Sequence, residues 1–180
     1  GDFDEDQAGA IMVRPQLVGD VVEQWRKHAA GGGPRSTIVF ACTVAHSRQL
    51  VGRFREAGVP AEHLDGFTPD REREAMLERL ARGEIRVVSN VMILSEGFDC
   101  PRVSCVVVAR PTASRTLYLQ MVGRALRPCP EIGKRDCVIL DHAGNTLRHG
   151  LVSEITSYEL DTGDTLDPAA GPRAACKECP

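Results

Sequence analysis

The stretch Thr37-Ile-Val-Phe-Ala-Cys42-Thr43 is the part of the sequence from which the fold class follows. Its apolar and β-branched residues predict a strand that is buried on both faces, as strands of parallel sheets are. Thr43 is a good N-cap and predicts a helix that runs to about Ala57 and ends at Gly58. A buried strand that leads directly into a helix is the repeating unit of α/β folds.

The same alternation continues on both sides of this stretch. Thr68 is expected to cap one of the helices, with Pro69 as its first residue. A last edge strand is expected at 152–160. We expect further strands at 61–64, 86–89, 103–109 and 136–141, and helices at 17–29, 69–82 and 115–127. This order predicts an α/β parallel sheet sandwiched by helices.

The chain divides into three parts by composition. Residues 1–34 are expected to form a connector, acidic and irregular at 1–16, followed by an amphipathic helix. Residues 35–160 carry the strand and helix pattern and form the α/β domain. Residues 161–180 lack a core pattern and predict a flexible tail.

Composition excludes several classes of protein. The formal net charge of −3 argues against a chain whose whole surface binds nucleic acid, so any such contact must be local. No apolar run is long enough to span a membrane, and the start does not resemble a signal peptide. Cys42, Cys105 and Cys137 lie in apolar runs as free thiols do, which favours a reducing cytoplasm.

The segment Gln120-Met-Val-Gly-Arg-Ala-Leu-Arg-Pro128 predicts a helix that presents two arginines. Gln120, Arg124 and Arg127 are spaced i, i+4 and i+7 and would share one face. Gly123 beside that face costs the helix about 1 kcal/mol and would let another surface approach closely. The residues alone fit either an anion-binding face or the solvated side of an amphipathic helix.

A second segment, Ser89-Asn-Val-Met-Ile-Leu-Ser-Glu-Gly-Phe-Asp-Cys-Pro101, follows a short buried strand. Asn90 is a good cap for one or two helical turns, and Gly97 suits a left-handed stop. We expect Ser89 and Asp99 to lie at the carboxyl ends of strands, where ligands bind in parallel sheets. The alternative is a plain turn in which Asp99 caps its own backbone.

The two segments resemble motifs V and VI of superfamily 2 (DEAD/DEAH-type) helicases. Ser89 to Pro101 is similar to motif V, a Thr or Ser followed by Gly-x-Asp, and Gln120 to Arg127 is similar to motif VI, Q-x-x-G-R-x-x-R. The sequence of these segments is most similar to that of bacterial RadD-like and restriction-subunit-like helicases, and the resemblance covers about 37–150. The resemblance implies a RecA-like domain of the P-loop NTPase type, the second helicase lobe only, without the Walker A and B motifs of the first.

The resemblance also implies roles in ATP hydrolysis. Arg127 would be the arginine finger, Arg124 its partner on the phosphates, and Gln120 would position either the attacking water or the arginines. ATP and Mg²⁺ would be bound mainly by the first lobe of the same polypeptide, so the isolated chain is expected to be inactive. The predicted ATP-binding residues are Gly97, Asp99, Gly123, Arg124 and Arg127.

Nucleic acid is the partner that the resemblance implies, held by sequence-independent backbone contacts. Helix N-termini offer free amides to phosphates, and motifs IV, IVa and V are used in this way. DNA as the partner, and a role in DNA repair or restriction, are favoured only by the sequence similarity around Gly97 and Arg124. The hydroxyls among the candidates are equally suited to capping. The predicted strand-binding residues are Thr43, Gly66, Thr68, Arg71 and Ser89.

Other features leave alternatives open. Cys176-Lys-Glu-Cys179 is either half of a zinc ribbon that would bind Zn²⁺ or a tail with two incidental thiols. His46 is expected at the surface, and Asp141 is expected to organise the turn at 144–145. For the whole chain, the alternatives are a non-catalytic nucleic-acid-binding module and an unrelated α/β nucleotide-dependent transferase.

Overall fold

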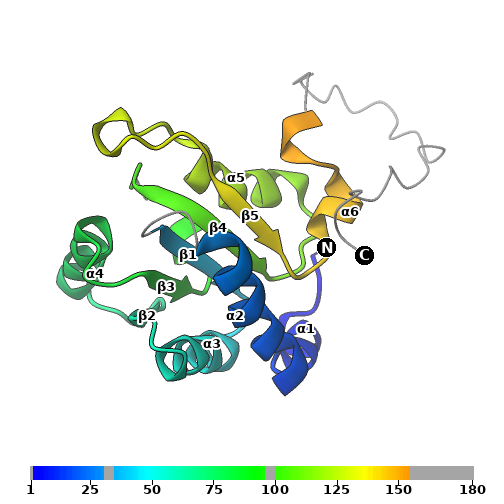
Figure 1. Ribbon diagram of the computed structural model, residues 1–180. Helices are drawn as coiled ribbons and strands as arrows, with labels where there is room; N and C mark the ends of the chain where they lie inside the picture. The colour runs from blue at the N-terminus through cyan, green and yellow to red at the C-terminus, as the bar shows by residue number, and fades with distance from the viewer. Residues whose placement is uncertain (1, 31–34, 96–99, 155–180) are drawn as a thin grey trace.

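The computed structural model describes residues 2–30, 35–95 and 100–154. Its centre is a parallel sheet in the order β2-β3-β1-β4-β5 (Figure 1). The strands are β1 (Ser36–Ala41), β2 (Ala61–Leu64), β3 (Val87–Asn90), β4 (Val103–Ala109) and β5 (Val138–Asp141). All four pairings in the sheet are parallel, which confirms the predicted α/β class.

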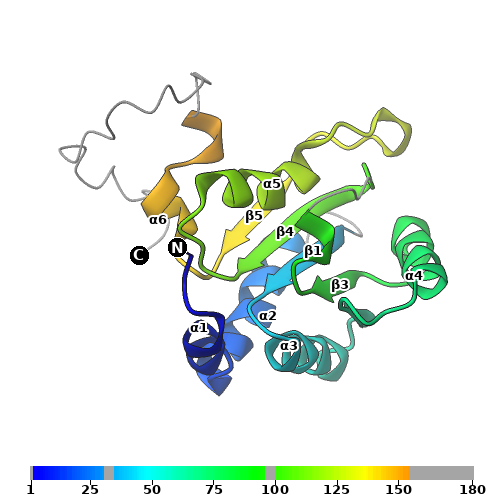
Figure 2. The same cartoon turned by 180° about the vertical axis from the view of Figure 1, so that it is seen from behind.

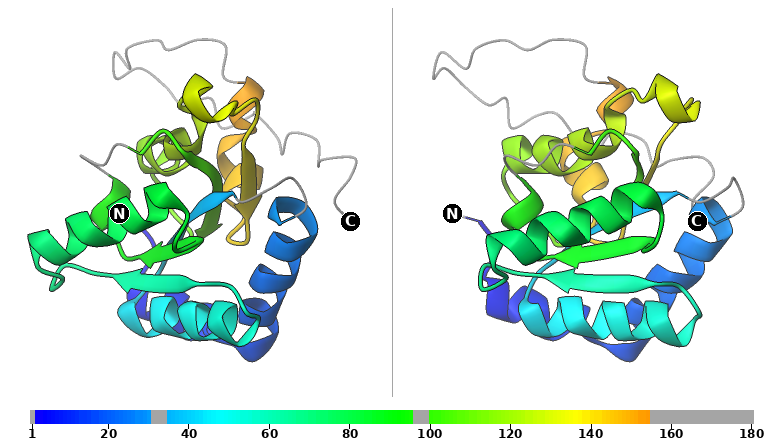
Figure 3. Two further views of the ribbon diagram at one scale, coloured as in Figure 1. Left: turned by 60° about the vertical axis from the view of Figure 1, so that its left-hand side comes forward. Right: turned by 90° about the vertical axis from the view of Figure 1, so that its left-hand side faces the viewer.

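Helices cover both faces of this sheet (Figures 2 and 3). One hydrophobic cluster packs α2 and α3 on one face, and a second packs α4 and α5 on the other. The helices are α1 (Glu5–Met12), α2 (Pro15–Ala29), α3 (Val44–Glu56), α4 (Asp70–Arg82), α5 (Arg115–Leu126) and α6 (Asn145–His149). Short 3-10 turns are η1 (Ile93–Ser95), η2 (Pro130–Ile132) and η3 (Val152–Glu154).

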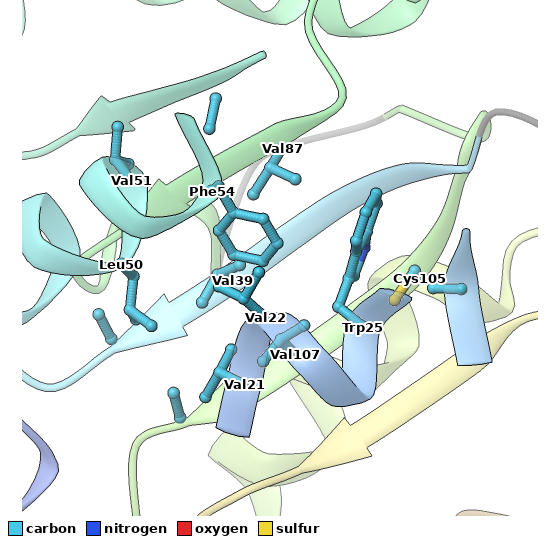
Figure 4. Packing of buried hydrophobic residues seen from close by; sticks show 14 of the residues in the cluster. Val21, Val22, Trp25, Val39, Leu50, Val51, Phe54, Val87, Cys105 and Val107 are labelled. Atoms are coloured by element: carbon cyan, nitrogen blue, oxygen red, sulfur yellow. The ribbon is translucent and has the colours of Figure 1, made fainter. Parts of the chain in front are cut away.

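The face under α2 and α3 is organised around Trp25 (Figure 4). Its ring meets Phe54 of α3 edge to face, with the centroids 5.5 Å apart. The indole nitrogen donates a hydrogen bond of 2.8 Å to Thr37 Oγ1 at the start of β1. A buried indole N–H needs such a partner, so this bond fixes where α2 crosses the sheet.

Local signals fix the helix ends, and Thr43 acts as predicted. Thr43 Oγ1 accepts a hydrogen bond of 3.2 Å from His46 N and caps α3. Ser114 caps α5 in the same way, through Leu117 N. Gly83 follows α4 with φ +77°, a left-handed conformation in which glycine avoids the Cβ penalty.

Three expectations about the elements are wrong. Residues 5–12 are helical rather than irregular, because Asp4 caps α1 through Gln7 N at 2.9 Å. Thr68 does not cap α4: Pro69 occupies the N-cap and the Thr68 hydroxyl bonds Asp65 instead. Residues 152–154 form a 3-10 turn and not a strand, and residues 155–160 lie outside the described part of the chain.

The arginine segment also differs from its prediction. Helix α5 ends at Leu126, and Arg127 follows it in extended geometry, with φ −63° and ψ 131°. The residue before a proline is disfavoured in the α region, and Pro128 therefore ends the helix one residue earlier than expected. Gln120 and Arg124 remain on α5, whereas Arg127 is at the point where the chain leaves it.

Candidate functional site

The candidate residues divide between the two opposite edges of the sheet. Helix α5 joins two parallel strands, β4 and β5, so it runs back across the sheet from the carboxyl edge to the amino edge. In Figure 1 the arrows of β3 and β5 point toward the N-terminus of the chain, and the loop after α5 lies on the opposite side. The arginines of α5 are therefore at the amino edge. The carboxyl edge carries Thr43, Gly66, Thr68 and Ser89.

This division places the two ends of the Ser89–Pro101 segment. Ser89 lies in β3 near the carboxyl edge, but Cys100 and Pro101 directly precede β4 at the amino edge. The two ends of the segment lie at opposite edges because β3 and β4 are parallel, with β1 between them. Gly97 and Asp99 lie outside the described residues.

The arginine end of α5 has a buried side and an accessible side. Gln120 and Arg124 are partly buried, and Arg127 is exposed. A Cβ built on Gly123 would meet no described atom within 4 Å, so the helix surface beside Arg124 is open. A cavity of about 330 Å³ next to Arg127 is also lined by Lys134 and Arg135. The apolar face of α5 is buried: Tyr118, Met121, Val122 and Ala125.

At the carboxyl edge, the loop between β2 and α4 is held by Asp65. Its carboxylate, in a residue only 6% exposed, accepts hydrogen bonds from Phe67 N at 3.0 Å and from the Thr68 hydroxyl at 3.3 Å. The backbone N–H of Thr68 also bonds the Asp65 carbonyl at 3.1 Å. Gly66 is exposed at the tip of this ordered turn.

Phe67 is a candidate that sequence reasoning missed. Its residue surface is 92% exposed, the largest value among the exposed large hydrophobic residues that the structure describes. The backbone N–H bond to Asp65 holds it at the tip of the loop, between Gly66 and Thr68. An aromatic residue inside a Gly-Phe-Thr-Pro turn, where no core can form, is the sequence signal that could have found it.

A buried network connects this loop to β3. Ser47 Oγ lies 2.7 Å from His63 Nδ1, and His63 Nε2 lies 2.9 Å from Asp65 Oδ2. Ser47 is also 2.7 Å from the Ser89 hydroxyl. The order Ser, His, Asp superficially matches a hydrolase triad, but Ser47 and Ser89 are both fully buried, so substrate has no access to them. The network is structural.

The network changes the interpretation of Ser89. Its side chain was predicted to contact a nucleic-acid phosphate, yet its hydroxyl is buried and bonded to Ser47. In this arrangement the Ser89 side chain faces the protein interior. The hydrogen bond from His63 holds the pKa of Asp65 below its ordinary value.

Two other candidates differ in accessibility. Thr43 is partly buried, and α1 packs closely against it: a Cβ on Gly9 would lie 2.6 Å from Thr43 Cγ2. Arg71 is exposed in the first turn of α4. His46, expected at the surface, is fully buried, and burial lowers its pKa to about 4.

Asp141 has the structural role predicted for it. Its carboxylate accepts a hydrogen bond of 3.0 Å from Ala143 N and so organises the turn before α6. Asn145, buried after that turn, accepts from Thr112 N and donates to the Arg110 carbonyl, both at 2.9 Å. These bonds connect the end of β5 to the segment between β4 and α5.

Within the described residues, no group of three or more His, Cys, Asp or Glu side chains is arranged to bind a metal ion. Cys176 and Cys179, predicted as half of a zinc site, lie outside those residues. None of the described helices has both the length and the apolar character needed to cross a membrane.

The model of the helicase conserved C-terminal domain matches residues 21–129, which include the arginine helix and the segment before β4. The chain belongs to this family. The family assignment confirms the resemblance to superfamily 2 helicases, and the all-parallel sheet matches the RecA-like lobe expected of them.

Curated relatives of this helicase C-terminal domain include two yeast proteins that are named as ATP-dependent helicases. A Schizosaccharomyces pombe protein, irc3, named as a mitochondrial ATP-dependent helicase, is 39% identical over 73% of this chain and 21% of its own length. A 51.5 kDa protein of a Lactococcus phage is 36% identical over 75% of the chain and 28% of its own. The Escherichia coli EcoKI restriction endonuclease subunit is 30% identical over 78% and 13%. The chain thus spans less than a third of each.

Solved structures agree on the fold. The helicase domain of Pyrococcus furiosus Hef superposes with a TM-score of 0.56 at 26% identity, over 77% of this chain and 28% of that one. An HsdR fragment of a type I restriction enzyme from Vibrio vulnificus gives 0.68 at 20% identity, over 87% and 32%. The C-terminal domain of the DEAD-box protein Dbp5 gives 0.57 at 24%, over 71% and 74%.

Proposed function

We propose that this chain is the C-terminal RecA-like lobe of an ATP-dependent DNA helicase or translocase, and that Arg127 and Arg124 complete an ATPase site formed with the first lobe. The observation that carries the proposal is the end of α5, where Arg127 is exposed and Arg124 lies about one turn earlier beside the open surface at Gly123. A guanidinium is always charged and meets phosphate oxygens bidentately.

Hydrolysis of ATP needs positive charge near the phosphates and little covalent chemistry from the protein. Hydrolysis of ATP, the substrate, spreads negative charge over the γ-phosphate oxygens, and positioned cations stabilise that charge. Closure of the two lobes would bring Arg127 to the γ-phosphate, and Gln120 would orient the attacking water. The Mg²⁺ that accompanies ATP would be held by the first lobe. Reopening after hydrolysis would move the bound strand between two grips.

The strand would be gripped at the opposite, carboxyl edge. The N-terminus of α4, a helix of 13 residues, offers amides and a positive dipole end to phosphates beside Gly66 and Thr68. Arg71 adds an exposed charge, and Phe67 adds a surface on which a base can stack. Thr43 remains a candidate contact, whereas Ser89 would act by supporting this loop through Ser47 and His63.

The choice of DNA over RNA rests on relatives. A restriction endonuclease subunit and UvrABC system protein B are among the curated proteins that are 30% or more identical to the chain. The Dbp5 domain and the HsdR fragment, both below 25% identity, support the fold alone. Competition between single-stranded DNA and RNA of one sequence, measured on the full-length protein, tests this choice.

The finger is tested by Arg127→Ala in the full-length protein. We expect nucleic-acid-stimulated ATP turnover to fall by about 10³-fold, with strand affinity unchanged, because the guanidinium acts only at the phosphate. Arg102→Ala, which removes an exposed arginine just before β4, is the control and should leave turnover unaltered. Normal turnover in Arg127→Ala with normal strand binding contradicts the proposal.

A further inference from the structure

The loop after α5 places one ammonium group against three backbone carbonyls. Lys134 Nζ donates to the carbonyl oxygens of Arg127 at 2.6 Å, Val103 at 2.6 Å and Pro101 at 3.1 Å. An ammonium has three N–H donors and no acceptor, so these carbonyls use its full capacity. Partial burial lowers the pKa of Lys134 because it removes water from the ammonium. The three hydrogen bonds offset this desolvation cost.

The carbonyl of Arg127 needs such a partner. The last carbonyls of a helix have no intrahelical donor, and Arg127, as the C-cap of α5, is already extended. A lysine near a helix C-terminus can bond these carbonyls and also interact favourably with the helix dipole. The direction in which Arg127 leaves α5 is therefore set partly by the lysine and not by the helix alone.

Lys134 is itself held in place. Its backbone N–H bonds the Cys129 carbonyl at 3.2 Å, and the preceding Gly133 bonds Pro130 at 2.9 Å with φ +66°. This compact turn follows η2 and directs the lysine side chain toward the C-terminal end of α5. Because both the backbone and the ammonium of Lys134 are hydrogen-bonded, the side chain can hold the carbonyls that it bonds at a fixed distance from one another.

We propose that Lys134 is a positioning residue of the ATPase site, which holds the backbone of Arg127 at a fixed place relative to the start of β4. Pro101 and Val103 supply that fixed place, since β4 lies inside the sheet between β1 and β5. The inference rests on the proposed role of Arg127 as the finger. A misplacement of about 1 Å can reduce a rate about 10²-fold, so the clamp matters for turnover.

The first test is Lys134→Met in the full-length protein, which keeps most of the side-chain volume and removes the donors. We expect kcat for stimulated ATP hydrolysis to fall about 10- to 100-fold, with KM for ATP and strand affinity nearly unchanged. Arg102→Met, which removes an exposed charge at the same edge, is the control and should leave kcat as it is. Unchanged kcat in a folded Lys134→Met protein overturns the proposal.

The second test separates positioning from a general structural role. In an Arg127→Ala background, Lys134→Met should reduce kcat no further, because the residue through which it acts is gone. An equal fractional loss in both backgrounds means that Lys134 supports the fold only, and overturns the proposal. If Arg127→Ala alone leaves turnover normal, the finger itself is wrong and the clamp proposal fails with it. Lys134→Gln, which retains two donors, replaces the Met variant in the cycle if that variant does not fold.

Discussion

His63 Nε2 lies 2.9 Å from Asp65 Oδ2, and this contact joins β2 to the loop that precedes α4. The hydrogen bond from His63 contributes most to lowering the pKa of Asp65, so the folded protein favours the ionised carboxylate. A carboxyl whose folded pKa is depressed stabilises the protein above its unfolded pKa, near 4, and this contribution is lost as the pH falls through the lowered value.

Asp65→Asn should therefore destabilise the protein in a pH-dependent way. We expect a loss of about 1–3 kcal/mol in the free energy of unfolding at pH 7, because charged hydrogen bonds to His63 and Phe67 are weakened. The difference from wild type should shrink below about pH 4. Urea unfolding at both pH values measures it, with the exposed Asp70→Asn as control. A difference that stays constant into acid would refute the assignment.

Phe67→Ala should weaken single-strand binding without changing its salt dependence. Loss of one stacked base costs about 1–3 kcal/mol, and stacking releases no counterions. Arg71→Ala is the matched comparison, because loss of a phosphate contact should reduce the slope of log K against log salt by about 1. Titrations at several salt concentrations measure both. An altered slope for Phe67→Ala, or no loss of affinity, would count against stacking.

Gly123→Ala should stabilise the fold while it lowers activity. Alanine gains up to about 1 kcal/mol over glycine inside a helix, and the new Cβ meets no described atom within 4 Å. If the first lobe or ATP approaches there, stimulated ATP hydrolysis should fall. Gly52→Ala in α3 is the control, since its Cβ is equally uncontacted. Thermal melts and ATPase rates give the two readouts, and equal rates for both variants would argue against a close approach at Gly123.

Thr37→Val should expose the dependence of the core on one hydroxyl. The indole N–H of Trp25 would lose its acceptor in a site where both residues are buried, at a cost of about 1–3 kcal/mol. Thr37→Ser keeps the hydroxyl and should cost less. In a Trp25→Phe background the valine should no longer carry this penalty. Equal losses for Val and Ser in urea unfolding would show that the hydrogen bond contributes little.

The elements of the fold could be predicted from sequence because their signals are local. The strands at 61–64 and 103–109 have the bounds expected for them, and Thr43 caps its helix as expected. Predictions failed where another side chain engaged the group that would otherwise cap a helix. Thr68 is a good N-cap in isolation, but its hydroxyl is engaged by the Asp65 carboxylate.

The sequence by itself determined the α/β class, the helicase motifs and the identity of the two arginines, because periodicity, caps and motif spacing depend on near neighbours. Only the tertiary structure decided that the arginine end of α5 and the loop after β2 lie at opposite edges, since this follows from the parallel strand order. It also decided that Ser89 is buried and that Lys134 bonds carbonyls 7, 31 and 33 residues away. Contacts over such separations exist only after the sheet has brought remote segments together.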